Sequence, residues 1–281
     1  MYVPGKKKGE KKMDRIESLC FMIALVAYFL STVLYFIFMA VKKTWASKAA
    51  FFLMLTGLCI HTVSIVTRGI NAGRLPLTNQ YEFASAFSWG IALVFLIFVK
   101  KFKFDLLGSF VAPVVFLVIG YAAMQSREIH ELMPALQSNW LGFHVFTAII
   151  AYGAFGVAFG IALAFLLKGK LHGKLAATIP DEKTLDLIIY RAVALGFLFL
   201  TLCMVTGAIW ANKAWGTYWN WDPKETWSLI TWIIYAIFLH LRVRKGMTGK
   251  KAAMFAAIGF ICVLFTYIGV NTLLSGLHSY K

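Results

Sequence analysis

The stretch WANKAWGTYWNWDPKETW, Trp210–Trp227, decides how the rest of the chain is interpreted. It contains five of the nine tryptophans in the sequence, and apolar runs flank it on both sides. Tryptophan rings are enriched at the boundary between hydrocarbon and water. Five within one stretch are more than two helix ends need for anchoring. The stretch is therefore expected to form an aromatic platform at a membrane surface.

The composition indicates that this platform belongs to a membrane protein. Of the 281 residues, 60% are hydrophobic and only 14% are charged, whereas a soluble domain carries roughly 25% charged residues. Apolar runs of about 20 residues, long enough to cross a bilayer, recur along the whole chain. The fold class is therefore predicted to be all-α, a polytopic membrane protein made of a single integral membrane domain, residues 1–281.

Eight spanning helices are predicted. The first apolar run follows a basic tail, but it is too long for the core of a signal peptide and lacks a small-residue cleavage site. It is therefore interpreted as a retained helix. The predicted spans are residues 17–41, 48–67, 81–99, 105–124, 140–167, 187–210, 224–243 and 252–275.

The net charge of +16 is concentrated in short clusters between the apolar runs. This distribution is typical of membrane topology and not of nucleic-acid binding. The odd-numbered loops hold most of the lysines and arginines, so the positive-inside rule places them in the cytoplasm. The tryptophan stretch and both termini are then expected outside, although the basic tail that includes Lys6 and Arg15 favours the opposite orientation.

Two loops on the predicted outer side carry helix-start signals. Asn79 with Glu82 three residues later fits a capping box. Asp222, Pro223 and Glu225 fit an N-cap, a first-turn proline and the third helical position. For Asp222 and Glu225, capping is an adequate alternative to a role in ligand binding.

Histidines near the membrane are the candidate ligand residues, because ionisable groups at that depth are costly and mark function. His144 and His278 lie near the outer ends of the fifth and eighth predicted helices and can face each other beneath the tryptophans. Two neutral imidazoles on one iron are a common haem arrangement. His240 is thirteen residues after Trp227, about 20 Å along a helix. It is too deep to share that site, so either a second site or contact with the inner headgroups explains it.

Other polar and thiol side chains have simpler interpretations. His61 is expected to bond to a neighbouring helix. Arg68 and Arg74 on the outer side can pair either with carboxylates of a ligand or with lipid headgroups. The four cysteines, Cys20, Cys59, Cys203 and Cys262, stand alone in apolar runs and form no CxxC pattern, so thiol redox chemistry and covalent haem attachment to this chain are unsupported.

With these residues in view, the sequence resembles a known family. The segment WGTYWNWDPKETW resembles the "WWD" signature, WGxxWxWDxxE, of membrane proteins that handle haem during cytochrome c maturation. The run Trp210–Tyr280, with its segments TWIIYAIFLHLR and GVNTLLSGLHSY, is similar to the CcsA (ResC) family, as is RLPLTNQYE after the second predicted helix. The related CcmC proteins are typically shorter, with six helices, and CcmF proteins are much longer.

The resemblance implies a ligand set. His144 and His278 match the two histidines that ligate haem iron at the outer site. His240 matches a transmembrane histidine of an inner site, whose opposite ligand is thought to come from a CcsB (ResB) partner. The positions implied to hold the haem are Trp215, Gly216, Trp219, Trp221, Asp222 and Glu225.

The implied function is transport of haem b to the outer membrane face and its covalent attachment to apocytochrome c CxxCH motifs, as a holocytochrome c synthase acting with a CcsB/ResB-type protein. The implied partners are apocytochrome c, haem and membrane lipid, with no nucleic acid. The bacterial plasma membrane is the expected location, with the thylakoid membrane as the alternative.

Two other functions stay open at this point. A CcmC-like carrier would pass haem to a separate chaperone without attaching it. A small-solute transporter with an aromatic gate would hold no haem at all.

Overall fold

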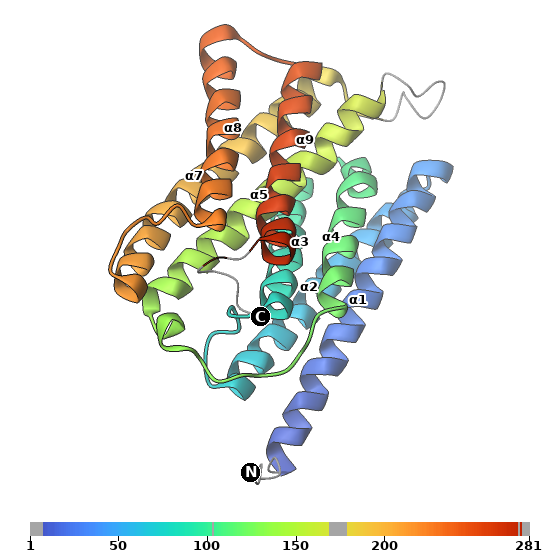
Figure 1. Cartoon of the computed structure of the whole chain (residues 1–281). Coiled ribbons are helices and arrows are strands. Elements are labelled where there is room, and N and C mark those ends of the chain that lie inside the picture. Colours follow the sequence, from blue (N-terminus) through green and yellow to red (C-terminus); the bar gives the residue numbers. More distant parts are fainter. Residues whose placement is uncertain (1–7, 103, 169–178, 275, 277–281) are drawn as a thin grey trace.

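The computed structural model describes residues 8–102, 104–168, 179–274 and 276. Within these ranges the chain forms only helices and their connections, which confirms the predicted all-α class (Figure 1). The long helices are α1 (Lys8–Val41), α2 (Thr44–Ala72), α3 (Gln80–Phe102), α4 (Gly108–Ala123), α5 (Asn139–Lys168), α7 (Glu182–Trp215), α8 (Pro223–Lys245) and α9 (Lys250–Leu264). Short helical segments are η1 (Asp105–Leu107), η2 (Pro134–Leu136), η3 (Phe265–Gly269) and α10 (Val270–Leu273).

Among the described residues, eight helical spans are long and apolar enough to cross a membrane, as predicted. The chain is therefore an integral membrane protein. Most helices extend a few residues beyond their predicted apolar runs, and polar side chains cap the starts of some of them. At the start of α7, for example, the Asp181 side chain accepts a hydrogen bond from the Thr184 backbone N–H at 3.1 Å. The Thr184 hydroxyl also bonds to this carboxylate, and these bonds lower the pKa of Asp181.

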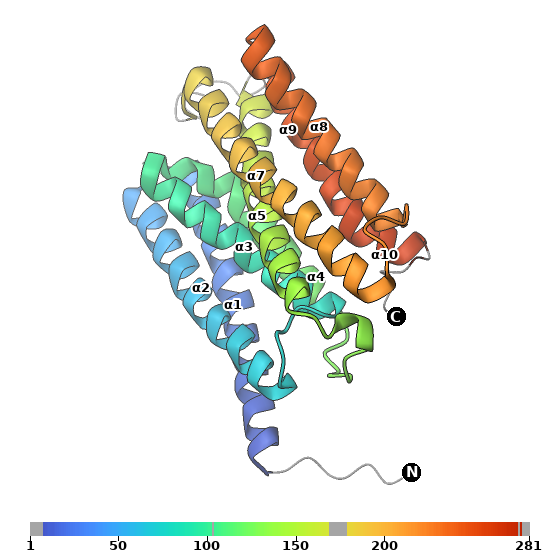
Figure 2. The same ribbon diagram turned by 90° about the vertical axis from the view of Figure 1, so that its left-hand side faces the viewer.

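Successive spans alternate in direction (Figures 1 and 2). The α1–α2, α3–α4 and α8–α9 connections lie at one end of the bundle, at the top of Figure 1. The α2–α3, α4–α5 and α7–α8 connections lie at the other end, at the bottom and left of Figure 1. The tryptophan stretch belongs to this second group, which is called the aromatic end below. The predicted pairing of odd and even loops is thus confirmed for these six connections, while the fifth predicted loop lies partly outside the described residues and the side of the membrane that each end faces stays a prediction.

Helices α3 and α5 form the buried centre of the bundle, and α7 and α8 are mostly exposed. The centre is tight because small residues meet there. A Cβ atom on Gly153 would lie 2.7 Å from the backbone carbonyl carbon of Gly90, so α3 and α5 touch backbone to backbone. Such glycine contacts are typical of helix packing in lipid, where van der Waals contact replaces the hydrophobic effect. The exposed apolar faces of α7 and α8 suit lipid or a partner helix.

One ion pair ties the outer helices together at the end opposite the aromatic end. Arg242 of α8 pairs with Asp186 of α7, and the Asp186 carboxylate also accepts the Gly249 backbone N–H at 2.8 Å. Arg242, one of the basic residues in the last turn of α8, therefore has a structural role beyond topology.

Candidate functional site

The tryptophan stretch is divided between two helices and a short connection. α7 continues through Trp215 and ends at Gly216, which has a left-handed φ of 78° and donates its N–H to the Asn212 carbonyl. α8 begins at Pro223. The predicted loop, residues 210–227, is thus too long. Trp210 and Trp215 are helical, and only residues 216–222 lie outside the helices. Helix α7 continues beyond its apolar run and ends at Gly216, because glycine tolerates the positive φ at which a helix stops.

The start of α8 confirms the predicted capping box. The Glu225 carboxylate accepts the backbone N–H groups of Asn220 at 2.8 Å and Asp222 at 3.2 Å. The Asp222 carboxylate accepts the N–H of Lys224 at 2.9 Å. These bonds satisfy donors that a helix start leaves without partners. They also fix the short connection as a compact turn.

Within that turn, Trp221 has an unusual backbone. Its φ is 57°, in the left-handed region that non-glycine residues rarely occupy. Its side chain is 70% exposed and meets Trp219 edge to face, with ring centroids 5.8 Å apart. Trp219 lines a cavity, whereas Trp221 stands on the surface beside it. The two predicted platform residues therefore face different surroundings.

The cavity lies at the aromatic end and has an empty volume of about 1180 Å³, including its open mouth. Mostly apolar and aromatic side chains line it, with a few polar groups. Its walls include His144, Tyr152, Cys203, Gly207, Trp210, Tyr218, Trp219, Lys224, Glu225, Tyr267 and Asn271. A large, flat and mainly apolar ligand fits such a lining.

His144 lies in the cavity wall with its ring held against α7. Its Nδ1 is 2.8 Å from the Cys203 carbonyl oxygen. A carbonyl can only accept, so Nδ1 is the protonated nitrogen and Nε2 carries the lone pair. The imidazole also stacks on Trp210, with ring centroids 5.9 Å apart and an angle of 18° between the planes. His144 thus has the tautomer and fixed orientation of a metal ligand.

Trp210 is itself fixed by the connection between α4 and α5. Its indole N–H donates to the Ala135 carbonyl at 2.9 Å, and its ring packs edge to face on Trp215 at 4.8 Å. Trp215 packs against Trp210, which lines the cavity. No pattern in the sequence indicated that η2, between α4 and α5, would contribute to this site.

Two further residues of the cavity wall come from the last span, where the α-helix is interrupted by one π-helical turn, η3. Such turns are often found at functional sites. The Tyr267 hydroxyl in this turn donates to the Gln80 carbonyl at 2.8 Å and joins η3 to the start of α3. The Asn271 amide donates to the Tyr267 carbonyl at 2.6 Å. These residues were missed from the sequence because a π-turn changes which side chains face inward.

The other two predicted histidines are not placed beside His144 by the described residues. His240 lies seventeen residues after Pro223 on α8, about 25 Å along the helix. It is exposed, and no described residue bonds to its ring. His278 lies outside the described residues. Gly276, two residues earlier, lies against Asp222 and Pro223 at the start of α8.

His61 has the structural role predicted for it. It is fully buried, and its ring nitrogens contact the Ser85 hydroxyl at 2.8 Å and the Tyr28 hydroxyl at 3.4 Å. These contacts join α1, α2 and α3. His61 is therefore not part of the cavity.

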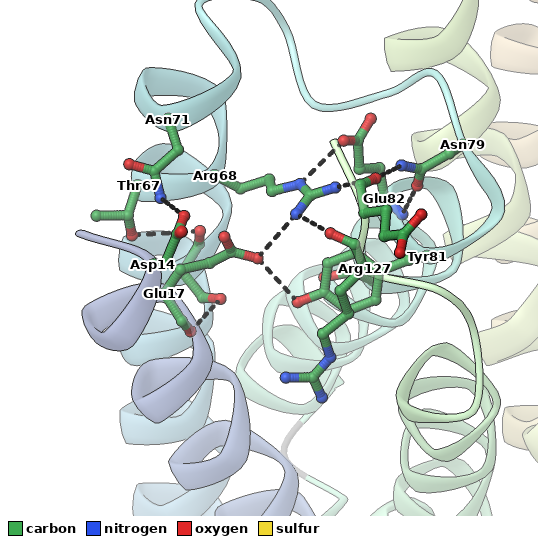
Figure 3. Close-up of polar contacts among 12 residues, drawn as sticks. Asp14, Glu17, Thr67, Arg68, Asn71, Asn79, Tyr81, Glu82 and Arg127 are labelled. Carbon is green, nitrogen blue, oxygen red and sulfur yellow. Dashed lines mark hydrogen bonds and ion pairs between the residues drawn. The ribbon is translucent and has the colours of Figure 1, made fainter. Parts of the chain in front are cut away.

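Arg68 (Figure 3) and Arg74 both pair with groups of the protein. Arg68 is buried and pairs with Glu82 at 2.9 Å, while Glu17 lies 3.6 Å away. It also donates to the carbonyls of Arg127 at 2.7 Å and Glu128 at 3.2 Å. The interpretation of Arg68 as a partner of ligand carboxylates or headgroups is therefore wrong, because its donors are already used inside the protein.

Glu82 organises the rest of this polar cluster. Its carboxylate pairs with Arg74 at 2.9 Å and accepts the Thr78 N–H at 2.9 Å. The Asn79 side chain accepts the Glu82 N–H at 2.8 Å. The predicted capping box is thus half formed, since Glu82 reaches Thr78 and not the Asn79 backbone. Arg74, like Arg68, is bound to Glu82.

The described residues contain no group of three or more histidine, cysteine, aspartate or glutamate side chains arranged to hold a metal ion. One histidine beside an aromatic wall instead suits a flat ligand that brings its own metal. Fold and cavity together define a polytopic membrane protein with a mainly apolar, aromatic-lined cavity at one end of the bundle.

The family follows from sequence comparison. The model of the family "Cytochrome C assembly protein" matches residues 77–278. Cytochrome c biogenesis protein CcsA of Cyanophora paradoxa is 35% identical, over 90% of this chain and 94% of that protein. CcsA of Prochlorococcus marinus (strain MIT 9301) is also 35% identical, over 91% and 92% of the two chains. The chain therefore belongs to the CcsA family of cytochrome c assembly proteins, with a role in cytochrome c maturation.

A solved structure shares the fold. The chain named Cytochrome c Heme Lyase CcmF superposes with a TM-score of 0.73 at 16% identity, covering 99% of this chain and 49% of that one. The present chain thus spans about half the length of that protein, and at this identity the likeness concerns the fold alone.

Proposed function

We propose that this chain carries haem b to the aromatic end of the bundle and presents it there for covalent attachment to the CxxCH motif of apocytochrome c. The observation that supports this most directly is His144, held as the Nδ1-protonated tautomer in the wall of a large aromatic cavity. Neutral imidazole is the usual axial ligand of haem iron, and aromatic walls suit the apolar macrocycle.

In this proposal, His144 and His278 bind the iron from its two sides. Gly276 lies against Asp222 and Pro223, at the start of α8, where Lys224 and Glu225 line the cavity. This contact supports the assignment, since His278 follows two residues later in the sequence.

The six other proposed haem-holding residues differ in what they contribute. Trp219 and Glu225 line the cavity and can contact the macrocycle. Trp215 supports Trp210 from behind. Gly216 and Asp222 shape the connection by ending α7 and starting α8. Exposed Trp221 is assigned to the arriving apocytochrome.

The attachment step needs no redox partner beyond ferrous haem. Each cysteine S–H of apocytochrome c adds across one vinyl C=C bond, so that sulfur bonds to one vinyl carbon and hydrogen to the other. The contribution of this chain is proximity and orientation, with the bond-forming chemistry supplied by haem and the thiols. The histidine of CxxCH would then replace one protein ligand on the iron.

His240 is proposed to bind haem at an inner position, opposite a ligand from a CcsB-type partner. His240 is exposed on α8, a helix that other helices of this chain cover little. This exposure supports the proposal, because a partner protein can reach the site and supply the second iron ligand. A route from an inner to an outer site suits a ligand made in the cytoplasm and used outside.

The aromatic end is proposed to face the outside of a bacterial plasma membrane or the lumen of a thylakoid. The basic connections at the opposite end support this orientation. Lys213→Cys at the aromatic end should react with a membrane-impermeant maleimide in intact cells, whereas Lys43→Cys should react only after permeabilisation. The reverse pattern would overturn the orientation.

Reconstitution tests the function. The chain, a CcsB-type partner and an apocytochrome are co-expressed in a strain without its own maturation system, and covalent haem is measured by in-gel haem staining. We expect covalent haem with the wild type, its loss with His144→Gly, and partial return on addition of imidazole. His240→Ala should lower the haem that reaches the outer site. Bound haem without attachment, with all three proteins expressed, would instead favour the CcmC-like carrier. A purified chain without a Soret band would overturn both functions.

A further inference from the structure

Three residues of α7 meet the ring of His144 on α5. Cys203, Gly207 and Trp210 are spaced four and three residues apart, which places them on one face of the helix. Each touches the imidazole in a different way. None of the three contacts follows from the tryptophan signature WGTYWNWDPKETW, and all three residues precede it in the sequence.

The first contact is the hydrogen bond from Nδ1 to the Cys203 carbonyl. A carbonyl oxygen has two lone pairs, so inside a helix it can accept both the N–H four residues later and a second donor. The Cys203 thiol is also near, 3.4 Å from Nδ1. The carbonyl contact is the shorter one and determines the tautomer.

The second contact depends on the absence of a side chain at Gly207. A Cβ atom there would lie 2.6 Å from Nδ1 and 2.8 Å from Cε1 of His144. Both distances are below van der Waals contact, so any other residue would displace the imidazole from the Cys203 carbonyl. Gly207 is thus the opening through which His144 reaches the α7 backbone.

The third contact fixes the plane of the ring. His144 stacks on Trp210, which is in turn held by the Ala135 carbonyl and by Trp215. The hydrogen bond to Cys203, the space left at Gly207 and the stacking on Trp210 together allow the imidazole only one position and one tautomer.

We propose that Cys203, Gly207 and Trp210 are positioning residues that hold His144 with Nε2 as the coordinating nitrogen, through the backbone carbonyl of Cys203 and not through its thiol. This inference rests on the proposed role of His144 as an iron ligand. Second partners of metal-bound histidines typically contribute 10–100-fold to metal affinity. The α7 face would therefore determine how tightly the outer site keeps haem, and so how readily it gives haem up.

The test uses the full chain, co-expressed with its partner and purified with haem. The variant Gly207→Ala is compared with Gly196→Ala, which lies eleven residues earlier on α7 and would place its Cβ 2.5 Å from Cε1 of Phe155 in the core. The control thus introduces a similar clash in the same helix pair, away from His144. Measured are the visible spectrum, the electron paramagnetic resonance signal of the ferric form, and the rate of haem loss to excess apomyoglobin.

We expect Gly207→Ala to shift the ferric signal and to speed haem loss by about tenfold or more, while Gly196→Ala changes neither in the protein that folds. Cys203→Ala keeps the carbonyl, so it should shift the ferric signal and speed haem loss much less than Gly207→Ala does, although its side chain lines the cavity. In a His144→Gly background supplied with imidazole, adding Gly207→Ala should have no further effect, because free imidazole is not tethered to α5. This double variant also removes the clash, so it stays informative if Gly207→Ala alone does not fold.

Equal effects of Gly207→Ala and Gly196→Ala, or no effect of either, would overturn the positioning role. A spectral change in Cys203→Ala as large as that in Gly207→Ala would do the same, since it would assign the contact to the thiol. If the wild type binds no haem, or if His144→Gly leaves the spectrum unchanged, the proposed function itself fails. The two failures are therefore distinguishable.

Discussion

The polar cluster around Arg68 and the aromatic cavity around His144 lie at the same end of the bundle, and they differ in what their side chains contact. In the polar cluster around Arg68, charged side chains of α1, α2 and α3 bind one another and backbone carbonyls between α4 and α5 (Figure 3). In the aromatic cavity, side chains of α5, α7, α8 and η3 line a space that is open to the surface. The polar cluster is completed by the protein itself, whereas the aromatic side chains leave a cavity between them.

At this end of the molecule, residues that stabilise the fold and residues that are proposed to bind haem therefore belong to two different groups. Removing one member of a buried ion network leaves the remaining charges without compensation, which is costly for folding. Removing a side chain from a cavity wall takes away fewer contacts. Substitutions in the polar cluster should therefore change stability more than haem binding, and those in the tryptophan turn should do the reverse.

The largest stability effect is expected for Arg68→Met. It leaves the buried Glu82 and Glu17 carboxylates without their shared cation, and should lower the free energy of unfolding by about 3–5 kcal/mol. Unfolding in mixed detergent micelles, followed by tryptophan fluorescence, measures this loss. Arg74→Met is the matched control and should cost less, because Glu82 keeps Arg68. We also expect a normal haem spectrum in the folded fraction of Arg68→Met. Loss of haem there would contradict the idea that this cluster affects stability more than haem binding.

An intermediate effect is expected for Asp222→Ala at the start of α8. Loss of the N-cap should cost about 1 kcal/mol and weaken haem binding, because Lys224 and Glu225 in the same turn line the cavity. Haem titration and unfolding of the same preparation measure both. Asp181→Ala removes the corresponding cap of α7 at the far end and should leave haem affinity unchanged. Equal losses of haem affinity in both variants would argue against a local effect.

The smallest stability effect, with the opposite sign, is expected for Trp221→Gly. Relief of a left-handed backbone gains about 1–2 kcal/mol, and the extra chain entropy of glycine offsets roughly 0.5–1 kcal/mol. Stability should therefore stay equal or rise slightly, while covalent attachment falls if Trp221 meets the apocytochrome. Gly216→Ala, at a φ of 78° with open space around its Cβ, should be destabilising through backbone strain alone. A clear loss of stability in Trp221→Gly would show that its ring contributes to folding.

Much of the architecture follows from local sequence. The apolar runs predicted all eight spans, and the DPKE segment predicted the capping box that starts α8. The position of His61 on a predicted helix indicated a bond to a neighbouring helix, which it makes. These features depend on residues close in sequence or on the general cost of placing polar groups in lipid.

Partners far apart in the sequence could not be predicted in this way. Arg68 and Arg74 looked available for a ligand, because a linear sequence does not reveal that Glu17 and the α4–α5 connection come to the same place. The contact between His144 and α7 bridges 59 residues and depends on a missing side chain at Gly207. Hydropathy carries no signal for such an opening.

The sequence by itself determined that this is a membrane protein with eight apolar spans and with five of its nine tryptophans in one stretch, since bilayer thickness and helix capping are read from neighbouring residues. Only the tertiary structure decided that Trp215 belongs to a helix, that Trp210 supports a histidine, and that the arginines are bound within the protein. Those outcomes depend on which helix faces pack together, and packing is a property of the assembled bundle.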